Sequence, residues 1–209
     1  LRAGAWFMIR VGGLSDLATL KNQPKDNKSH KTPAGQLDAI FEALPPLVER
    51  HAAGFAQVEA ELRDKGLVRL GASELAQEDV AQLSRYFEAH LAPIISPMVV
   101  DPRHPFPNLR NGRLYVACAL DGLPEPDALG IIEVPASEQR VVALGSDARA
   151  FRYVLLEDVL RLFLDRCFGD YAPSRSCVLR VTRNADIDPD DEGVEEEEDY
   201  RQHMKKVLK

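Results

Sequence analysis

Cysteine and long hydrophobic runs are scarce in this 209-residue sequence. Its three cysteines, Cys118, Cys167 and Cys177, lie far apart and form neither a CxxC pair nor a metal-binding spacing. We expect them to be small, reduced core residues, which fits a cytoplasmic protein. No stretch approaches the roughly 20 apolar residues that a membrane span requires, and no signal-peptide pattern is present. A transmembrane segment is therefore not expected.

A basic excess is missing as well. The formal net charge is −7, but Asp186–Asp199 holds ten carboxylates and no base, and the rest of the chain carries +3. Between Asp101 and Ala185, eleven acids accompany eleven bases, and every base is arginine. Arginine suits phosphate because its planar fork donates two parallel hydrogen bonds, although a preference for arginine codons explains the same composition. The composition permits a polyanion partner, whereas a nucleic-acid-binding domain would carry more positive charge.

The first half of the chain is predicted to be helical. The apolar segment Trp6–Leu14 is predicted to break at the Gly12–Gly13 pair, and the polar segment Ser15–Lys31 is predicted to be a loop. Thr32 is a favourable N-cap for the next helix, with proline at its first position. The apolar residues of that helix repeat at intervals of three and four; they are Leu37, Ile40, Phe41 and Leu44.

Two further helical segments follow. Pro45–Pro46 is expected to interrupt the helix, and a second run ends at Gly66. Glu74–Ile94 is predicted to be another helix, with Ser73 as its N-cap. Its apolar face consists of Val80, Leu83, Phe87 and Leu91. These helices predict an N-terminal α-helical bundle over residues 1–96.

Residues 97–209 are predicted to form a second domain of mixed α/β character. The proline-rich segment Pro93–Asn111 is expected to be an extended connector, because proline disfavours helix. Short strands with apolar alternation and one helix follow it. The expected strands are Leu114–Leu120, Leu129–Val134, Arg140–Leu144 and the segment from Cys177 to Thr182, and the helix is Phe151–Phe168. The fold class is therefore α+β, with a small, mainly antiparallel sheet in the second domain.

The acidic run contains a partial calcium-loop spacing. Asp186, Asp188, Asp190 and Glu197 occupy positions 1, 3, 5 and 12 of such a loop. The glycine required for its sharp turn is replaced by Asp191. We therefore reject a calcium site and expect a solvated loop that leads into a helix toward Lys209.

Two motifs resemble those of bacterial polyphosphate kinases. The first is Asp101-Pro102-x-His104-Pro105-Phe106-Pro107, followed by Asn111 and Leu114. The second is Leu179-Arg180-Val181-Thr182-Arg183-Asn184-Ala185-Asp186. Three shorter segments are also similar to the family: Trp6–Leu14, Thr32-Pro33 with Gln36, Leu37 and Ile40, and Leu156–Val159. The resemblance covers nearly the whole chain in the expected order.

The resemblance implies an N-terminal helical domain followed by a head domain that takes part in dimer contacts. It implies an enzyme that reversibly transfers the terminal phosphate of ATP to inorganic polyphosphate through a phosphohistidine, with magnesium. ATP, ADP and polyphosphate would be the partners of the parent enzyme, and no cofactor is expected to be bound to this chain alone. The catalytic C-terminal domains of the family are absent from these 209 residues.

No site residue is carried over from the family. Arg2 stands where family members have a base-contacting asparagine, so no nucleotide-binding residue is assigned. The five histidines (His30, His51, His90, His104 and His203) lie outside the catalytic motifs. His104 has Asp101 nearby but no serine or cysteine nucleophile, which favours a structural role. We assign no catalytic, cofactor-binding or metal residue.

Two functional hypotheses follow. The first is a fragment of a polyphosphate kinase that is structural and dimerising, forms homo-oligomers and is inactive by itself. The alternative is a standalone non-catalytic module for dimerisation or polyanion binding. Neither hypothesis includes a nucleic-acid partner.

Overall fold

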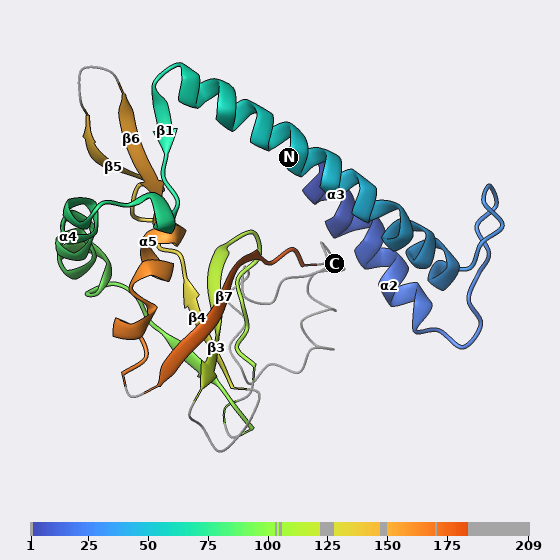
Figure 1. The fold of residues 1–209 in the computed structure, drawn as a ribbon. Helices are drawn as coiled ribbons and strands as arrows, with labels where there is room; N and C mark the ends of the chain where they lie inside the picture. Colours follow the sequence, from blue (N-terminus) through green and yellow to red (C-terminus); the bar gives the residue numbers. More distant parts are fainter. Residues whose placement is uncertain are drawn as a thin grey trace. The chain divides into compact units, whose positions relative to one another are not determined.

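The computed structural model describes residues 2–102, 104, 106–121, 128–146, 150–169 and 171–183. The chain forms two compact units, of which one is Leu47–Val181 and the other contains the residues on either side of it. Helices and short strands are both present, which confirms the α+β class (Figure 1). The helix expected after the acidic run, the calcium-like spacing and His203 lie outside the described residues.

The N-terminal helix does not end at its glycine pair. α1 (Arg2–Trp6), a π-helical turn (Phe7–Val11) and α2 (Gly12–Ala18) follow one another without interruption. Gly12 keeps right-handed helical angles, with φ −56° and ψ −57°. Glycine makes a helix less stable but does not forbid it, so the predicted break was wrong. The polar loop is correspondingly shorter than expected.

α3 (Pro33–Asp64) begins as predicted. The Gly35 N–H donates to Thr32 Oγ1 at 3.2 Å, and a proline occupies the first helical position. The predicted interruption was wrong, because the helix continues through Pro45–Pro46. Each proline removes one N–H donor, but its fixed φ is compatible with a helix. The helical turns before and after the two prolines therefore keep them in the helix. α3 ends before Gly66, whose φ of +82° favours glycine after a helix.

The strands of the Leu47–Val181 unit form two small sheets. They are β1 (Leu67–Arg69), β2 (Met98–Val100), β3 (Leu114–Asp121), β4 (Leu129–Glu133), β5 (Val141–Ser146), β6 (Phe151–Leu155) and β7 (Ala172–Arg180). One sheet has the order β1-β6-β5, with β1 parallel to β6. The other has the order β2-β4-β3-β7 and is antiparallel throughout (Figure 1). The expectation of mainly antiparallel pairing is confirmed, although β1 and β2 were not predicted.

The helix predicted over Phe151–Phe168 was wrong at both ends. Phe151–Leu155 is the strand β6, and α5 covers only Leu156–Leu162 before a 3₁₀ turn at Leu164–Arg166. The sequence FRYVL is rich in aromatic and β-branched residues, which suit a pleated surface. β6 also pairs with β1 on one side and β5 on the other. β5 precedes β6 closely, but β1 is distant in sequence, so spacing within the segment could not reveal that partner.

The helix predicted over Glu74–Ile94 has a different cap. α4 (Gln77–Tyr86) begins where the Ala76 N–H donates to Asp79 Oδ2 at 3.0 Å. Ser73 lies instead in a separate 3₁₀ turn. A π-helical turn, Phe87–Leu91, continues α4. The acidic side chain inside the first turn, rather than an upstream hydroxyl, therefore fixes where this helix begins.

α4 packs in the same core as both sheets and α5. Leu83, Phe87 and Leu91 are at most 2% exposed and share one cluster with Val116 and Leu156. A role for α4 in a separate N-terminal helical bundle is therefore not confirmed, and the boundary after residue 96 stays a prediction. No helix within the described part of the chain is long and apolar enough to cross a membrane.

Candidate functional site

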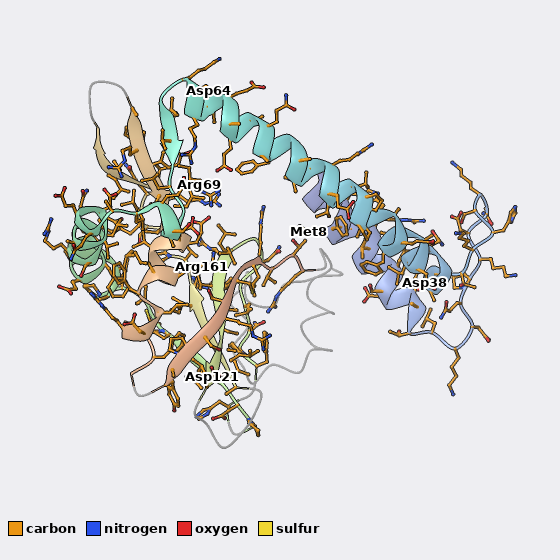
Figure 2. All side chains as sticks on the ribbon, viewed as in Figure 1. Met8, Asp38, Asp64, Arg69, Asp121 and Arg161 are labelled. Carbon is orange, nitrogen blue, oxygen red and sulfur yellow. The ribbon has the colours of Figure 1, made fainter. Side chains whose placement is uncertain are left out.

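A cavity of about 900 Å³ lies between the C-terminal part of α3, β1 and α5. Small residues of α3 and of the segment after β1, among them Ala56, Ala60 and Gly71, leave room for it. Its charged lining residues are Glu59, Arg63, Arg69, Glu74, Asp158 and Arg161. Figure 2 labels Arg69 on β1 and Arg161 on α5. The cavity thus combines the segment from α3 to the turn after β1 with residues of α5 that are distant in sequence.

Two of its arginines belong to one chain of ion pairs. Arg69 Nη1 contacts Glu59 Oε1 at 3.1 Å, and Arg69 Nη2 contacts Asp158 Oδ2 at 3.0 Å. Arg161 Nη1 lies 3.6 Å from the other oxygen of Asp158, and its Nε donates to Ser176 Oγ at 3.1 Å. Burial alone would lower the pKa of Arg69, but its two carboxylate partners outweigh this and raise that pKa above its usual value.

The third arginine stabilises the turn beside β1. Arg63 Nη2 donates to the Arg69 carbonyl at 2.9 Å and to Glu74 Oε1 at 3.0 Å. The Gly71 N–H donates to the other oxygen of Glu74 at 2.8 Å. That N–H, with Arg63 second, lowers the pKa of Glu74 below its usual value. Arg63 therefore holds local backbone structure rather than projecting freely into the cavity.

The cavity carries balanced charge. Its three arginines are matched by three glutamates or aspartates, and a phosphate would have to displace a carboxylate to bind Arg63 or Arg69. Phosphoryl transfer requires surplus positive charge around the moving group. The sequence did not indicate this cavity. The all-arginine composition of Asp101–Ala185 includes only one of the cavity arginines, Arg161, and does not show where arginines meet.

Two buried carboxylates form further pairs with arginine. Glu157 is 3% exposed and accepts hydrogen bonds from Arg140 Nε at 3.0 Å and Nη2 at 2.5 Å. Asp79 is 7% exposed and accepts one from Arg152 Nη2 at 2.5 Å. Arg152 lies on β6 and Asp79 on α4, so the second pair joins a strand to a helix. Both pairs fit a structural role, because the carboxylates have no open side.

The Asp79–Arg152 pair should make stability depend on acid pH. Burial acts to raise the pKa of Asp79, but Arg152 and the Ala76 N–H outweigh it, and the pKa lies below its usual value. This contribution is present above the unfolded carboxyl pKa of about 4 and is lost as pH falls through the lower folded value. Arg152→Gln should cost about 1–3 kcal/mol near neutral pH.

Urea unfolding over a pH series measures this effect. Wild-type stability should fall more steeply on acidification than that of Asp79→Asn, which has no titrating group at this position. Equal pH dependence in the two proteins would contradict the assignment.

The described histidines do not gather into one site. His30 follows a turn with φ +56°, His51 is exposed on α3, and His90 stacks on Tyr86 with ring centroids 4.8 Å apart. His104 Nδ1 lies 2.9 Å from Asp101 Oδ1, and the His104 N–H donates to the same oxygen at 2.8 Å. This aspartate closes the turn of the first motif, so the geometry of His104 is that of a structural residue.

The cysteines differ from one another. Cys118 is buried, Cys167 is partly buried and Cys177 is exposed, and all three are free thiols. Burial, with Asp165 second, raises the pKa of Cys167 to about 11. All three cysteines were expected to lie in the core, and this prediction was wrong for Cys177. Within the described residues, no group of three His, Cys, Asp or Glu side chains is placed to hold a metal ion.

Comparison with known proteins decides the family. A family model described as the polyphosphate kinase middle domain matches residues 78–209. This chain belongs to the polyphosphate kinase family. The polyphosphate kinase of Exiguobacterium sibiricum is 33% identical over 190 residues, which are 90% of this chain and 26% of that protein. The polyphosphate kinase of Staphylococcus haemolyticus is 30% identical over 193 residues, which are 91% of this chain and 26% of that protein.

The fold is also similar to that of a solved family member. The crystal structure of polyphosphate kinase from Porphyromonas gingivalis aligns with a TM-score of 0.68 and 21% identity, over 90% of this chain and 28% of that one. The family predicted from the two sequence motifs is thus confirmed. The chain spans only about a quarter of the length of these relatives.

Proposed function

We propose that this chain is the middle part of an enzyme that reversibly transfers the terminal phosphate of ATP to inorganic polyphosphate, with magnesium. The residues described here have a structural and dimerising role in it and hold no catalytic group. The family match at residues 78–209 carries this proposal. The balanced cavity supports it, because each of its arginines is already held by a carboxylate.

A chimera tests the proposal. The matching region of the Exiguobacterium sibiricum enzyme is replaced by this chain, and ATP-dependent polyphosphate synthesis and its reversal are measured for the chimera and for the chain alone. The chimera should be active and the chain alone should show no turnover above background. Turnover by the isolated 209-residue chain would contradict the structural role, and a folded but inactive chimera would contradict the proposed parent activity.

A homo-oligomer is part of the same proposal. α3 exposes the side chains of Val48, Phe55 and Val58, which are 60%, 51% and 52% accessible. Exposed apolar groups on one helix are typical of interaction surfaces. Light scattering of the chain over a concentration series should show a dimer, and a monomer at the highest concentration would argue against the dimerising role.

A further inference from the structure

The outer edge of β7 is the longest open strand edge in the described part of the chain. β7 ends the β2-β4-β3-β7 sheet, and among the described residues it pairs only with β3 (Figure 1). It has nine residues, whereas β1 and β2, which also lie at sheet ends, have three each. The fourth end strand, β5, is covered in part, because Gln82 of α4 donates to its Ala143 carbonyl at 3.2 Å. An exposed strand edge is a template for pairing with another chain.

Alternate residues of β7 direct their backbone groups to this edge. Directly after the strand, the Val181 N–H donates to the Arg113 carbonyl at 3.4 Å, so Val181 bonds toward the β3 side. Along an antiparallel pair, successive residues bond to opposite sides. The backbone N–H and carbonyl groups that point to the open edge are therefore those of Ser176, Val178 and Arg180.

The side chains of these three residues lie on the side of the sheet where α5 packs. The register places Ser176 opposite Cys118 and Val178 opposite Val116, and both partners belong to the core cluster that contains α5. The Arg161 Nε of α5 donates to Ser176 Oγ at 3.1 Å. Because side chains alternate along a strand, a strand added at this edge would place every second side chain on the same side.

The cavity of about 900 Å³ reaches this edge strand. Ser176 lines the cavity together with Asp158, Arg161 and Leu162 of α5. The cavity therefore leaves room beside β7 for side chains of an added strand. An edge strand next to such a space is suited to peptide recognition, because main-chain hydrogen bonds give affinity and pockets for alternate side chains give specificity.

The charges beside the edge favour an acidic peptide. β7 contains two arginines and no acidic residue. Arg180 is exposed, and no ion pair to it is found in the part of the chain that the structure describes. Arg161 Nη1 lies 3.6 Å from Asp158, too far for a hydrogen bond, while Arg69 holds the other oxygen of Asp158 at 3.0 Å. Both Arg161 and Arg180 can thus donate to an arriving carboxylate, and Val178 between them is 37% exposed and suits an apolar side chain.

We propose that the outer edge of β7 binds an extended acidic peptide segment of another protein by strand addition. On the α5 side, the segment carries an acidic, an apolar and a second acidic side chain at every second position. The acidic side chains pair with Arg161 and Arg180, and the apolar one packs on Val178. A second copy of β7 fits this edge less well, because it would bring arginines and no carboxylate. The inference goes beyond the proposed function and does not depend on the activity of the parent enzyme.

The first test uses labelled peptides and the whole chain. Fluorescence anisotropy measures the affinity for the peptide TETVTET and for its basic counterpart TKTVTKT, which should bind at least about tenfold more weakly. Two further probes are N-methylated on alternate residues of TETVTET, one at the glutamates and valine and the other at the threonines. Each set of methyl groups removes the N–H donors along one edge of the extended peptide. Only one of the two methylated probes should lose binding, whereas loss by both or by neither would overturn the proposal, as would no binding of TETVTET.

The second test changes the strand edge itself. Val178→Pro removes one N–H from the open edge and leaves the bonds to β3, and it should weaken TETVTET binding at least about fivefold. Val141→Pro on β5 is the matched control. The Arg140 carbonyl accepts from the Leu156 N–H, directly after β6, so the N–H of the next residue, Val141, also points away from β6. The control should change affinity less than about twofold, and equal losses in the two variants would contradict the assignment to β7.

A charge variant tests the edge without a proline. Arg180→Gln should weaken TETVTET binding about fivefold and binding of the neutral peptide TQTVTQT less than about twofold, because only the first peptide offers a carboxylate. Equal losses for the two peptides would overturn the proposed pairing. Urea unfolding checks that each variant is folded. Light scattering tests the remaining occupant: a wild-type dimer that Val178→Pro converts to a monomer, with no TETVTET binding, would assign the edge to a second copy and overturn the proposal.

Discussion

Phe87→Ala is expected to destabilise the chain by about 3–5 kcal/mol. Phe87 is 2% exposed, and its ring centroid lies 5.2 Å from that of Phe163 in the same core. Removing the ring loses both its transfer free energy and the contacts around the cavity left behind. It also loses the aromatic pair, which contributes beyond the buried area. Urea unfolding followed by circular dichroism measures the change.

Phe106→Ala is the matched control. Phe106 is 62% exposed, so the same substitution there should change the free energy of unfolding by less than about 0.5 kcal/mol. If Phe87→Ala cost as little as the control, the π-helical turn that continues α4 would not belong to the core of the strands. The comparison therefore tests the packing of this turn as well as the size of the effect.

Gly130→Ala is expected to cost about 2–3 kcal/mol, through overpacking rather than through loss of contacts. Gly130 lies in β4 between Val99 of β2 and Cys118 of β3. An added Cβ would come 2.5 Å from Phe168 Cζ and 2.8 Å from Cys118 Sγ. Both neighbours are at most 5% exposed, so neither side chain can move into solvent. The strand or the ring must shift.

A double variant identifies the cause. Phe168→Leu removes the ring atoms that the new methyl group would meet, so Gly130→Ala should cost clearly less in that background. Gly54→Ala is the control, because it lies within α3 with no heavy atom within 4 Å of an added Cβ. It should stabilise the chain by up to about 1 kcal/mol. If the losses in the free energy of unfolding caused by Gly130→Ala and Phe168→Leu were additive, the clash between the new methyl group and the ring would be contradicted.

The sequence by itself determined several local features. Thr32 and the proline after it specified the start of α3, because a hydroxyl N-cap and a proline need only their own backbone. The alternation in Leu114–Leu120 specified β3, since a strand buried on one face repeats every second residue. The motifs around His104 and Arg180 specified the family, which the match at residues 78–209 confirms.

Only the tertiary structure decided the rest. β6 became a strand because β1 and β5 pair with it, and α3 continued through Pro45–Pro46. The pairing of the arginines was likewise invisible in the sequence. Arg69 pairs with Glu59 and Asp158, residues 10 and 89 positions away, whereas Arg180 is exposed at the end of β7. Composition counts charges, but the distance between them, which sets whether a guanidinium is free for a ligand, is fixed only when the chain folds.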